Sequence, residues 1–421
     1  MESLTKILRI FLFSLLTASA VIMNSCHDMK HPADLIIYNA NIYTCDSAFS
    51  VAQAVAIKDG LIISLGTTDY VLSRYGSDDQ INAKGKYVYP GFIDAHSHFY
   101  GLANMQRYAD LSGAGSFEEV ISIIRQWHTD YPSEWILGFG WDQNKWPGKQ
   151  FPSNSLLDKH FPGVPILLTR IDGHAVLAST EAINRSQLGV IPQGEAIYNN
   201  GKLTGVFLES TADKIKAAVP QISEMETESN LMKASELCYA AGLTSVTDAG
   251  LDAADIQRLR QLQDAKKLLL RINVMLNPTE ENFEQYLSKG IITTPVLTIR
   301  SIKLYADGAL GSRGACLRKP YTDDPGTKGM MVISENKMEE FCKKAFDAGF
   351  QVCTHAIGDS AVGFVLRQYA GFLKGKNDRR WRIEHAQVVD PQDIDLFGDF
   401  NIVPSIQATH ATSDMGWAYE R

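Results

Sequence analysis

Cysteine is scarce in this sequence, and basic residues are not in excess. The 421 residues include six cysteines, and 40 lysines and arginines stand against 48 aspartates and glutamates, a net charge of −8. That balance leaves no basic surface on which to bind nucleic acid. After residue 25, no apolar run reaches the ~20 residues that a membrane-spanning helix needs. With 45% hydrophobic and 21% charged residues, the composition excludes a largely disordered chain and predicts a sizeable globular protein.

Residues 1–25 have the pattern of an export signal. Lys6 and Arg9 precede an apolar stretch, residues 10–23, that is too short to span a membrane but suits a signal-peptide core. A small residue and then Cys26 follow, which resembles the signal of a bacterial lipoprotein. We therefore expect export and a lipid anchor at Cys26, on the outer membrane or the periplasmic side of a bacterial cell envelope. Ordinary secretion and an uncleaved anchor are the alternatives.

The remaining cysteines are odd in number and cannot form a complete set of disulfides. We interpret them mostly as small buried hydrophobic residues. They are Cys45, Cys238, Cys316, Cys342 and Cys353.

Residues 34–89 form a predicted module of short strands. An apolar run at Leu35–Tyr38 is followed by a second one from Ala54 to Ile63, and Asp59-Gly60 divides the second run. An Asp-Gly pair between two apolar runs favours a tight β-hairpin. The module has too few strands to close a core by itself.

Residues 90–421 alternate apolar strands with helical stretches, which predicts a parallel sheet. Several of the strands end in polar residues that can carry chemistry, an arrangement typical of a (β/α)₈ barrel, the TIM-type α/β fold. The predicted strands are Val88–Ala95, Leu243–Asp248, Arg271–Met275, Ser301–Tyr305, Phe350–His355, Arg380–His385 and Asn401–Ile406.

Two irregularities modify this barrel. The distance from the first barrel strand to the second far exceeds one β/α unit, so residues 112–235 are predicted to be an insertion, which we place over the barrel mouth. Seven strands are visible where the fold has eight, and an open barrel would expose apolar edges. We therefore expect a truncated chain, with the eighth strand missing beyond Arg421.

The strongest motif is the His-x-His of His96 and His98, at the end of the first barrel strand. Side chains alternate along a strand, so both imidazoles point the same way and can bind one divalent metal. Such a pair is weak evidence alone, but His355 and His385 stand at the ends of two later strands. Four histidines at the same end of three parallel strands indicate a metal centre.

Lys303 lies in the middle of a strand, between Ile302 and Leu304, whose side chains suit the outer helices. Its own side chain therefore points into the barrel, where an unpaired ammonium is costly and metal ions would repel it. Carboxylation by CO₂ would turn the amine into an anionic group that can bridge two metals. The alternative is an ion pair with Asp307 or Asp248.

Together these segments resemble the amidohydrolase superfamily, in the amidohydrolase-3 subgroup that includes enzymes like N-substituted formamide deformylase. The resemblance runs from Asp34 to Arg421. Its motifs are residues 90–98, 140–143, 170–174, 303–315, 354–359, 384–387 and 405–414.

The resemblance implies two divalent metal ions, which we take to be zinc. His96 and His98 would hold one ion, His355 and His385 the other, and carboxylated Lys303 would bridge them. The family's general base is an aspartate at the end of the eighth strand, which would lie beyond the last residue of this sequence. We therefore assign no catalytic residue here and expect little activity from the chain as it stands.

Four further residues are weaker candidates for binding substrate. Trp141 and His174 lie in the insertion, where they would line the pocket or merely pack in a core. Arg313 follows the strand of Lys303 in a glycine-rich loop and is placed to meet an anionic group. His410 follows the seventh strand and is placed to reach the pocket.

This pattern predicts a hydrolase of carbon–nitrogen bonds other than peptide bonds, in amides, formamides or cyclic amides, acting on a small molecule through a metal-activated water. One alternative is a metal-dependent deaminase of a heterocycle, which would need no inward lysine if it used a single metal. The other is a non-catalytic surface lipoprotein that binds a metal or a ligand without turnover. A homo-oligomer is compatible with each.

Overall fold

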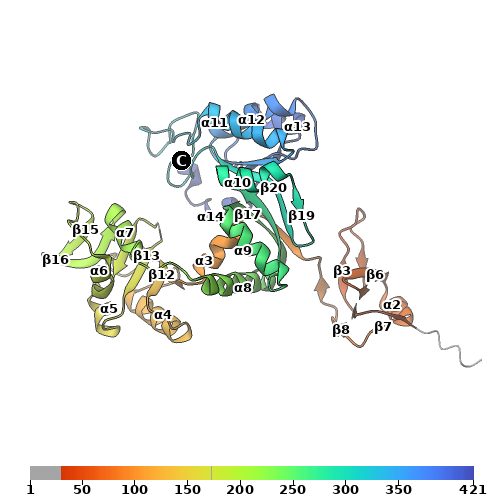
Figure 1. The fold of residues 1–421 in the computed structure, drawn as a ribbon, viewed down its shortest axis with the longest axis horizontal. Helices are drawn as coiled ribbons and strands as arrows, with labels where there is room; N and C mark the ends of the chain where they lie inside the picture. The colour runs from red at the N-terminus through yellow and green to blue at the C-terminus, as the bar shows by residue number, and fades with distance from the viewer. Residues whose placement is uncertain (1–29, 172) are drawn as a thin grey trace, which may run out of the picture. The chain divides into compact units, whose positions relative to one another are not determined.

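The computed structural model describes residues 30–171 and 173–421. The chain divides into two compact units, the first ending at Phe92 and the second beginning at Ile93 (Figure 1). The predicted signal peptide and Cys26 lie outside the described residues.

The first unit is built of short strands. One sheet has the order β6-β5-β2-β8, a second has the order β4-β3-β9, and β1 pairs with β7. The bounds are β1 His31–Pro32, β2 Leu35–Tyr38, β3 Asn41–Tyr43, β4 Val51–Ala52, β5 Ala54–Lys58, β6 Leu61–Gly66, α2 Thr68–Arg74, β7 Tyr75–Gly76, β8 Gln80–Asn82 and β9 Tyr87–Val88.

The hairpin predicted at Asp59-Gly60 is confirmed. Strands β5 and β6 are antiparallel, and the two turn residues both have left-handed backbones, with φ of 51° and 74°. A tight two-residue turn of this kind needs positive φ at both positions, which aspartate tolerates and glycine adopts freely.

The second unit contains the predicted barrel. Its seven parallel strands follow the order β10-β17-β18-β20-β21-β22-β23, and the short β19 pairs antiparallel with β20. The bounds are β10 Phe92–Ser97, β17 Leu243–Leu251, β18 Arg271–Leu276, β19 Ile292–Thr293, β20 Leu297–Tyr305, β21 Gln351–Ala356, β22 Arg382–His385 and β23 Val403–Ser405.

The first barrel strand begins four residues later than its apolar pattern suggested. Val88 pairs with Ile42 in the first unit, because the apolar run continues from one sheet into the next across Pro90 and Gly91. In β20 the alternation is as predicted, since Ile302 and Leu304 pack in the main core between strands and helices.

Helices cover the outside of the barrel strands (Figure 1). Ser223 and Ser334 cap α8 and α11, their hydroxyls accepting the amides of Glu226 at 3.2 Å and Lys337 at 3.4 Å. Such caps satisfy amides that have no partner within the helix. The bounds are α3 Phe99–Met105, α8 Glu224–Ala240, α9 Ala253–Asp264, α10 Glu280–Gln285, η2 Leu287–Lys289, α11 Glu335–Asp347, α12 Asp359–Leu373, η3 Pro391–Asp393, α13 Ile394–Asp399, α14 Thr409–Ser413 and η4 Ala418–Glu420.

Between α3 and α8 the chain forms a separate mixed sheet, in the order β11-β12-β13-β14-β16-β15, with its own apolar clusters. None of the helices within residues 30–171 and 173–421 combines the length and apolar character needed to span a bilayer. The bounds are β11 Ala109–Asp110, α4 Phe117–Asp130, β12 Ile136–Trp141, η1 Gln143–Lys145, α5 Ser155–His160, β13 Ile166–Arg170, β14 Ala175–Ala178, α6 Thr180–Ser186, β15 Ala196–Asn199, β16 Lys202–Leu208 and α7 Glu209–Lys216.

The cysteines of the described part are all free thiols. Cys238, Cys342 and Cys353 are buried, as expected for small hydrophobic residues, whereas Cys45 is exposed. Cys353 of β21 shares a small cluster with Ala249 of β17 and Met275 of β18.

Candidate metal centre

The four histidines predicted as metal ligands meet at the carboxyl ends of their strands. The ring of His96 lies 5.8 Å from that of His98 and 4.7 Å from that of His385, measured between centroids. The rings of His355 and His385 are 4.6 Å apart. His410, on α14, extends the cluster, with its ring 5.6 Å from that of His385.

Strand alternation alone would not bring His385 into this cluster. In a regular strand its side chain would point to the opposite face from that of Glu384. The backbone instead turns left-handed at His385 and Ala386, with φ of 72° and 41°. Positive φ is costly for residues other than glycine, and such strain often marks a functional site. It lets the ring of His385 contact those of His96 and His355.

Hydrogen bonds to the Nδ1 atoms hold two of the rings. His96 Nδ1 lies 2.5 Å from Oε2 of Glu384, and His385 Nδ1 lies 2.5 Å from Oε1 of Gln407. Each contact leaves Nε2 of its ring for another partner. An acceptor on the far nitrogen is the usual support of a metal-binding histidine.

Glu384 is itself held by Arg382, through Nε at 2.7 Å and Nη2 at 2.8 Å. Burial raises the pKa of Glu384, but hydrogen bonds from His96 and Arg382 outweigh it and lower that pKa to about 2. The carboxyl group is therefore ionised. None of Glu384, Arg382 and Gln407 is among the site residues predicted from the sequence, although alternation along β22 places the first two on the inner face with Lys303.

Burial also favours the neutral form of three of these imidazoles, those of His98, His355 and His385. It lowers the pKa of His98, and it lowers those of His355 to about 4 and His385 to about 3, with nearby Lys303 adding to each effect. A neutral imidazole has a free nitrogen lone pair, which is the form that binds metals.

Lys303 lies inside the barrel and is 1% exposed. Its Nζ lies 5.2 Å from the centroid of the Tyr305 ring, and burial lowers its pKa to about 8. Across residues 30–171 and 173–421, no carboxylate forms an ion pair with it. The side chain of Lys303 therefore points inward, as its strand pattern predicts. It does not form the alternative ion pair with Asp307 or Asp248.

The two carboxylates considered as partners of Lys303 are engaged elsewhere. Asp248 accepts the backbone amide of Tyr100 at 2.7 Å. Asp307 accepts three backbone amides, those of Cys316 at 2.9 Å, Ile357 at 3.0 Å and Gly358 at 2.8 Å. Asp307 thus ties the glycine-rich loop after β20 to the segment after β21.

The donor set fits a divalent metal in its chemistry, because neutral imidazoles are common metal ligands and two of them have their second nitrogen supported. Within the described part of the chain, however, no group of three or more His, Cys, Asp or Glu side chains is arranged to hold an ion. Neighbouring rings among these four histidines meet edge to face at interplanar angles of 62° to 87°.

Two of the other residues predicted to bind substrate, Trp141 and Arg313, have the partners given for them outside the histidine cluster. Trp141 is 1% exposed and its indole donates to the carbonyl of Leu168 at 2.8 Å, which is the position of a core residue. His174 is exposed just before β14. Arg313 forms an ion pair with Asp323 at 2.7 Å.

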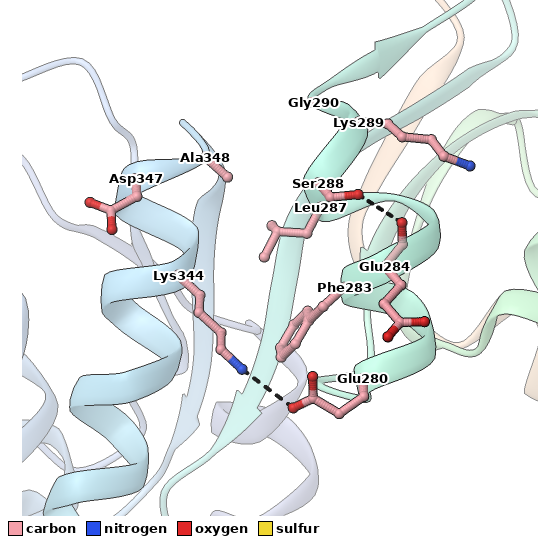
Figure 2. A pocket seen from close by; sticks show the side chains of 10 residues that line it. All are labelled: Glu280, Phe283, Glu284, Leu287, Ser288, Lys289, Gly290, Lys344, Asp347 and Ala348. Carbon is pink, nitrogen blue, oxygen red and sulfur yellow. Dashed lines mark hydrogen bonds and ion pairs between the residues drawn. The ribbon is translucent and has the colours of Figure 1, made fainter.

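A separate hollow of about 730 Å³ lies on the outer surface, between α10, η2 and α11 (Figure 2). It contains none of the predicted site residues. Lys344 reaches across it to Glu280 at 3.3 Å and lies over the ring of Phe283, so this hollow contributes nothing to the histidine cluster.

A parallel barrel with chemically capable side chains at the carboxyl ends of its strands is the architecture of a barrel enzyme. The chain belongs to the amidohydrolase family, whose model matches residues 79–421. The predicted resemblance to that family and the predicted barrel are both confirmed.

Individual proteins agree with this assignment. Protein LONG AFTER FAR-RED 3 of Arabidopsis thaliana is 32% identical, over 91% of this chain and 69% of its own. N-substituted formamide deformylase of Arthrobacter pascens is 27% identical, over 89% and 72%. The crystal structure of an uncharacterized metal-dependent hydrolase from Pyrococcus horikoshii matches with a TM-score of 0.72 and 26% identity, over 92% and 77%.

Proposed function

We propose that this protein is a metal-dependent hydrolase of carbon–nitrogen bonds other than peptide bonds, acting on a small-molecule amide, formamide or cyclic amide. The observation that carries the proposal is the meeting of His96, His98, His355 and His385 at one end of the barrel. Family membership supports a metal-dependent hydrolase. The similarity to a formamide deformylase supports the choice of bond.

We assign His96 and His98 to one ion, His355 and His385 to a second, and a carboxylated Lys303 to both, with zinc as the metal. A bound divalent ion would supply Lewis acidity towards a carbonyl and lower the pKa of a bound water. The chain's own contribution is to present neutral ring nitrogens. Gln407 and Glu384 hold two of the rings by Nδ1, and His410 stands beside them to orient substrate.

The inward lysine favours this hydrolase over a single-metal deaminase. Lys303 is buried beside the histidines, and no carboxylate within the described residues forms an ion pair with it. A single ion held by histidines would have no use for that amine, and a protonated amine would repel the ion. A binuclear centre bridged by the modified lysine gives the side chain a chemical role.

The test is a substrate screen on the zinc-supplemented protein, which measures amine release from N-substituted formamides and amides and ammonia release from aminated heterocycles. Amine release that is lost in His385→Ala and kept in His31→Ala, an exposed histidine of the first unit, would support the proposal. Ammonia release alone would identify the deaminase. Zinc binding without turnover, both in this chain and in a version extended through the downstream reading frame, would identify the ligand-binding alternative.

We also propose, from the sequence alone, that the chain is exported and lipid-anchored through Cys26. Growth of an expressing bacterium with a labelled fatty acid should label the wild type and not Cys26→Ser. Loss of both the label and membrane association in Cys26→Ser would support the lipid anchor. Release of both the wild type and Cys26→Ser into the medium would indicate ordinary secretion.

A further inference from the structure

Glu384 is a fully buried carboxylate that touches the histidine cluster. It is 0% exposed, and its contacts are with Arg382 and His96. Oε1 accepts from Arg382 Nε at 2.7 Å, while Oε2 accepts from Arg382 Nη2 at 2.8 Å and lies 2.5 Å from His96 Nδ1. A carboxylate that receives a two-pronged guanidinium contact is ionised and can only accept.

The ionised carboxylate determines which nitrogen of His96 carries the proton. Since both Glu384 oxygens are acceptors, His96 must donate its Nδ1–H to Oε2. In the neutral ring, which is the form that binds a metal, the lone pair then lies on Nε2. His385 has a different partner, the neutral side-chain amide of Gln407. The partner of His96 therefore carries a full negative charge, whereas the partner of His385 is neutral.

Arg382 fixes this carboxylate in position across the open side of the barrel. Its Nη2 also donates to the carbonyl of Ala95 in β10 at 2.8 Å and to Oγ of Ser405 in β23 at 2.9 Å. Strands β10 and β23 are the two ends of the parallel sheet path. One guanidinium thus joins β10, β22 and β23 at the point where His96 is held.

We propose that Glu384 is a positioning residue that locks His96 in its Nδ1–H form and strengthens Nε2 as a metal donor, so that the ion held by His96 binds more tightly than the ion held by His385. The second half of this inference rests on the metal centre of the proposed function. The first half concerns the metal-free chain and stands alone. A carboxylate on the far nitrogen raises the basicity of an imidazole, and a neutral amide does so less.

The first experiment is nitrogen NMR of the metal-free full chain labelled at its histidines, with His96 assigned by the signal missing from His96→Asn. An Nδ1–H signal for His96 is expected. An Nε2–H signal for His96 would overturn the inference. In Glu384→Gln the amide can donate to Nδ1, so the proton of His96 is expected to move to Nε2, a change that a merely structural ion pair would not produce.

The second experiment is a zinc titration against a chromophoric chelator. Glu384→Gln is expected to weaken the tighter of the two binding steps by about 10- to 100-fold, the usual effect of removing such a support. Glu384→Asp, which keeps the charge, should restore part of the loss. The matched variant Gln407→Ala should weaken only the looser step, and weakening of the tighter step by Gln407→Ala but not by Glu384→Gln would overturn the inference.

The two experiments separate this inference from the proposed function. If the wild type binds no zinc, the metal centre fails, while the NMR signal still decides whether Glu384 sets the proton position of His96. If the wild type binds zinc and His96 is in its Nε2–H form, the metal centre stands and the positioning role fails. The wild-type NMR measurement decides the first half even if Glu384→Gln does not fold.

Discussion

At the scale of single residues, the chemistry of this barrel depends on which charges are left unpaired inside it. Among the residues that the structure describes, Lys303 is buried without an ion pair, whereas Glu384 and Asp307 each accept several hydrogen bonds. An unpaired buried charge is costly, so a protein keeps one where it has a use. Lys303 is therefore the side chain whose removal is most informative.

Replacing Lys303 by alanine is expected to remove one metal equivalent, because the proposed bridge between the ions is lost. Elemental analysis should find about two ions per wild-type chain and about one in Lys303→Ala. Lys344→Ala, on the outer helix α11, is the control and should keep the wild-type content. Unchanged content in Lys303→Ala would contradict a bridging lysine.

Asp248 should make the stability of the fold depend on pH. Burial raises its pKa from an ordinary 3.8 to about 7, with one opposing hydrogen bond from the amide of Tyr100. The folded state therefore holds this proton to higher pH than the unfolded state. Stability from the protonated form is complete below about pH 4 and is lost as pH rises through about 7.

The neutral variant Asp248→Asn should accordingly be more stable than the wild type at pH 8, by an amount on the order of 2 kcal/mol. Urea unfolding at pH 5 and pH 8, with chelator present throughout, measures the difference between the two proteins. The raised pKa of Asp248 would be contradicted if the wild type were the more stable protein at pH 8. It would also be contradicted if the difference in free energy of unfolding did not grow between pH 5 and pH 8.

At the scale of elements, the connections that follow the barrel strands are fixed by close backbone contacts. The loop after β20 and the start of α12 meet at Gly358, whose amide donates to Asp307 at 2.8 Å. A side chain built there would put its Cβ 2.2 Å from the carbonyl oxygen of Cys316. Space, and not backbone conformation, therefore requires glycine, since Gly358 has φ of −76°.

Gly358→Ala is expected to lower stability by about 1–3 kcal/mol, the usual cost of forcing extra atoms into a packed site. Gly371 lies within α12, and no atom is within 4 Å of the Cβ that alanine would add there. Gly371→Ala should therefore be neutral or more stable by up to about 1 kcal/mol. Thermal unfolding midpoints compare the two. Equal midpoints would show that the loop moves aside freely.

At the scale of the whole molecule, the two compact units can be followed separately by spectroscopy. All six tryptophans belong to the second unit, which carries the histidine cluster and the insertion. Tryptophan fluorescence therefore reports on the unfolding of that unit alone. The tryptophans are Trp127, Trp135, Trp141, Trp146, Trp381 and Trp417.

Removing metal should lower the thermal midpoint seen by tryptophan fluorescence. An ion that binds only the folded state stabilises it by about 4 kcal/mol when present at a thousand times its dissociation constant. Chelator should remove that stabilisation, added zinc should restore it, and Lys303→Ala should show a smaller shift. Identical midpoints with chelator and with zinc would contradict a metal centre in this unit.

The sequence by itself determined the parallel barrel, the hairpin at Asp59-Gly60 and the histidines at the strand ends. These features follow from local patterns, namely apolar runs, a turn dipeptide and the alternation of side chains along a strand. Strand ends collect on one side of a parallel barrel whatever the loops between them do, so His96, His355 and His385 could be placed together.

Only the tertiary structure decided which groups hold those histidines and which candidates are occupied elsewhere. The contact of His96 with Glu384 joins residues 288 positions apart, and no local pattern specifies such a pairing. The left-handed backbone at His385 and the burial of Trp141 likewise come from packing between distant segments. Local sequence sets the direction of a side chain within its strand, whereas its partner is set by the segments that fold against it.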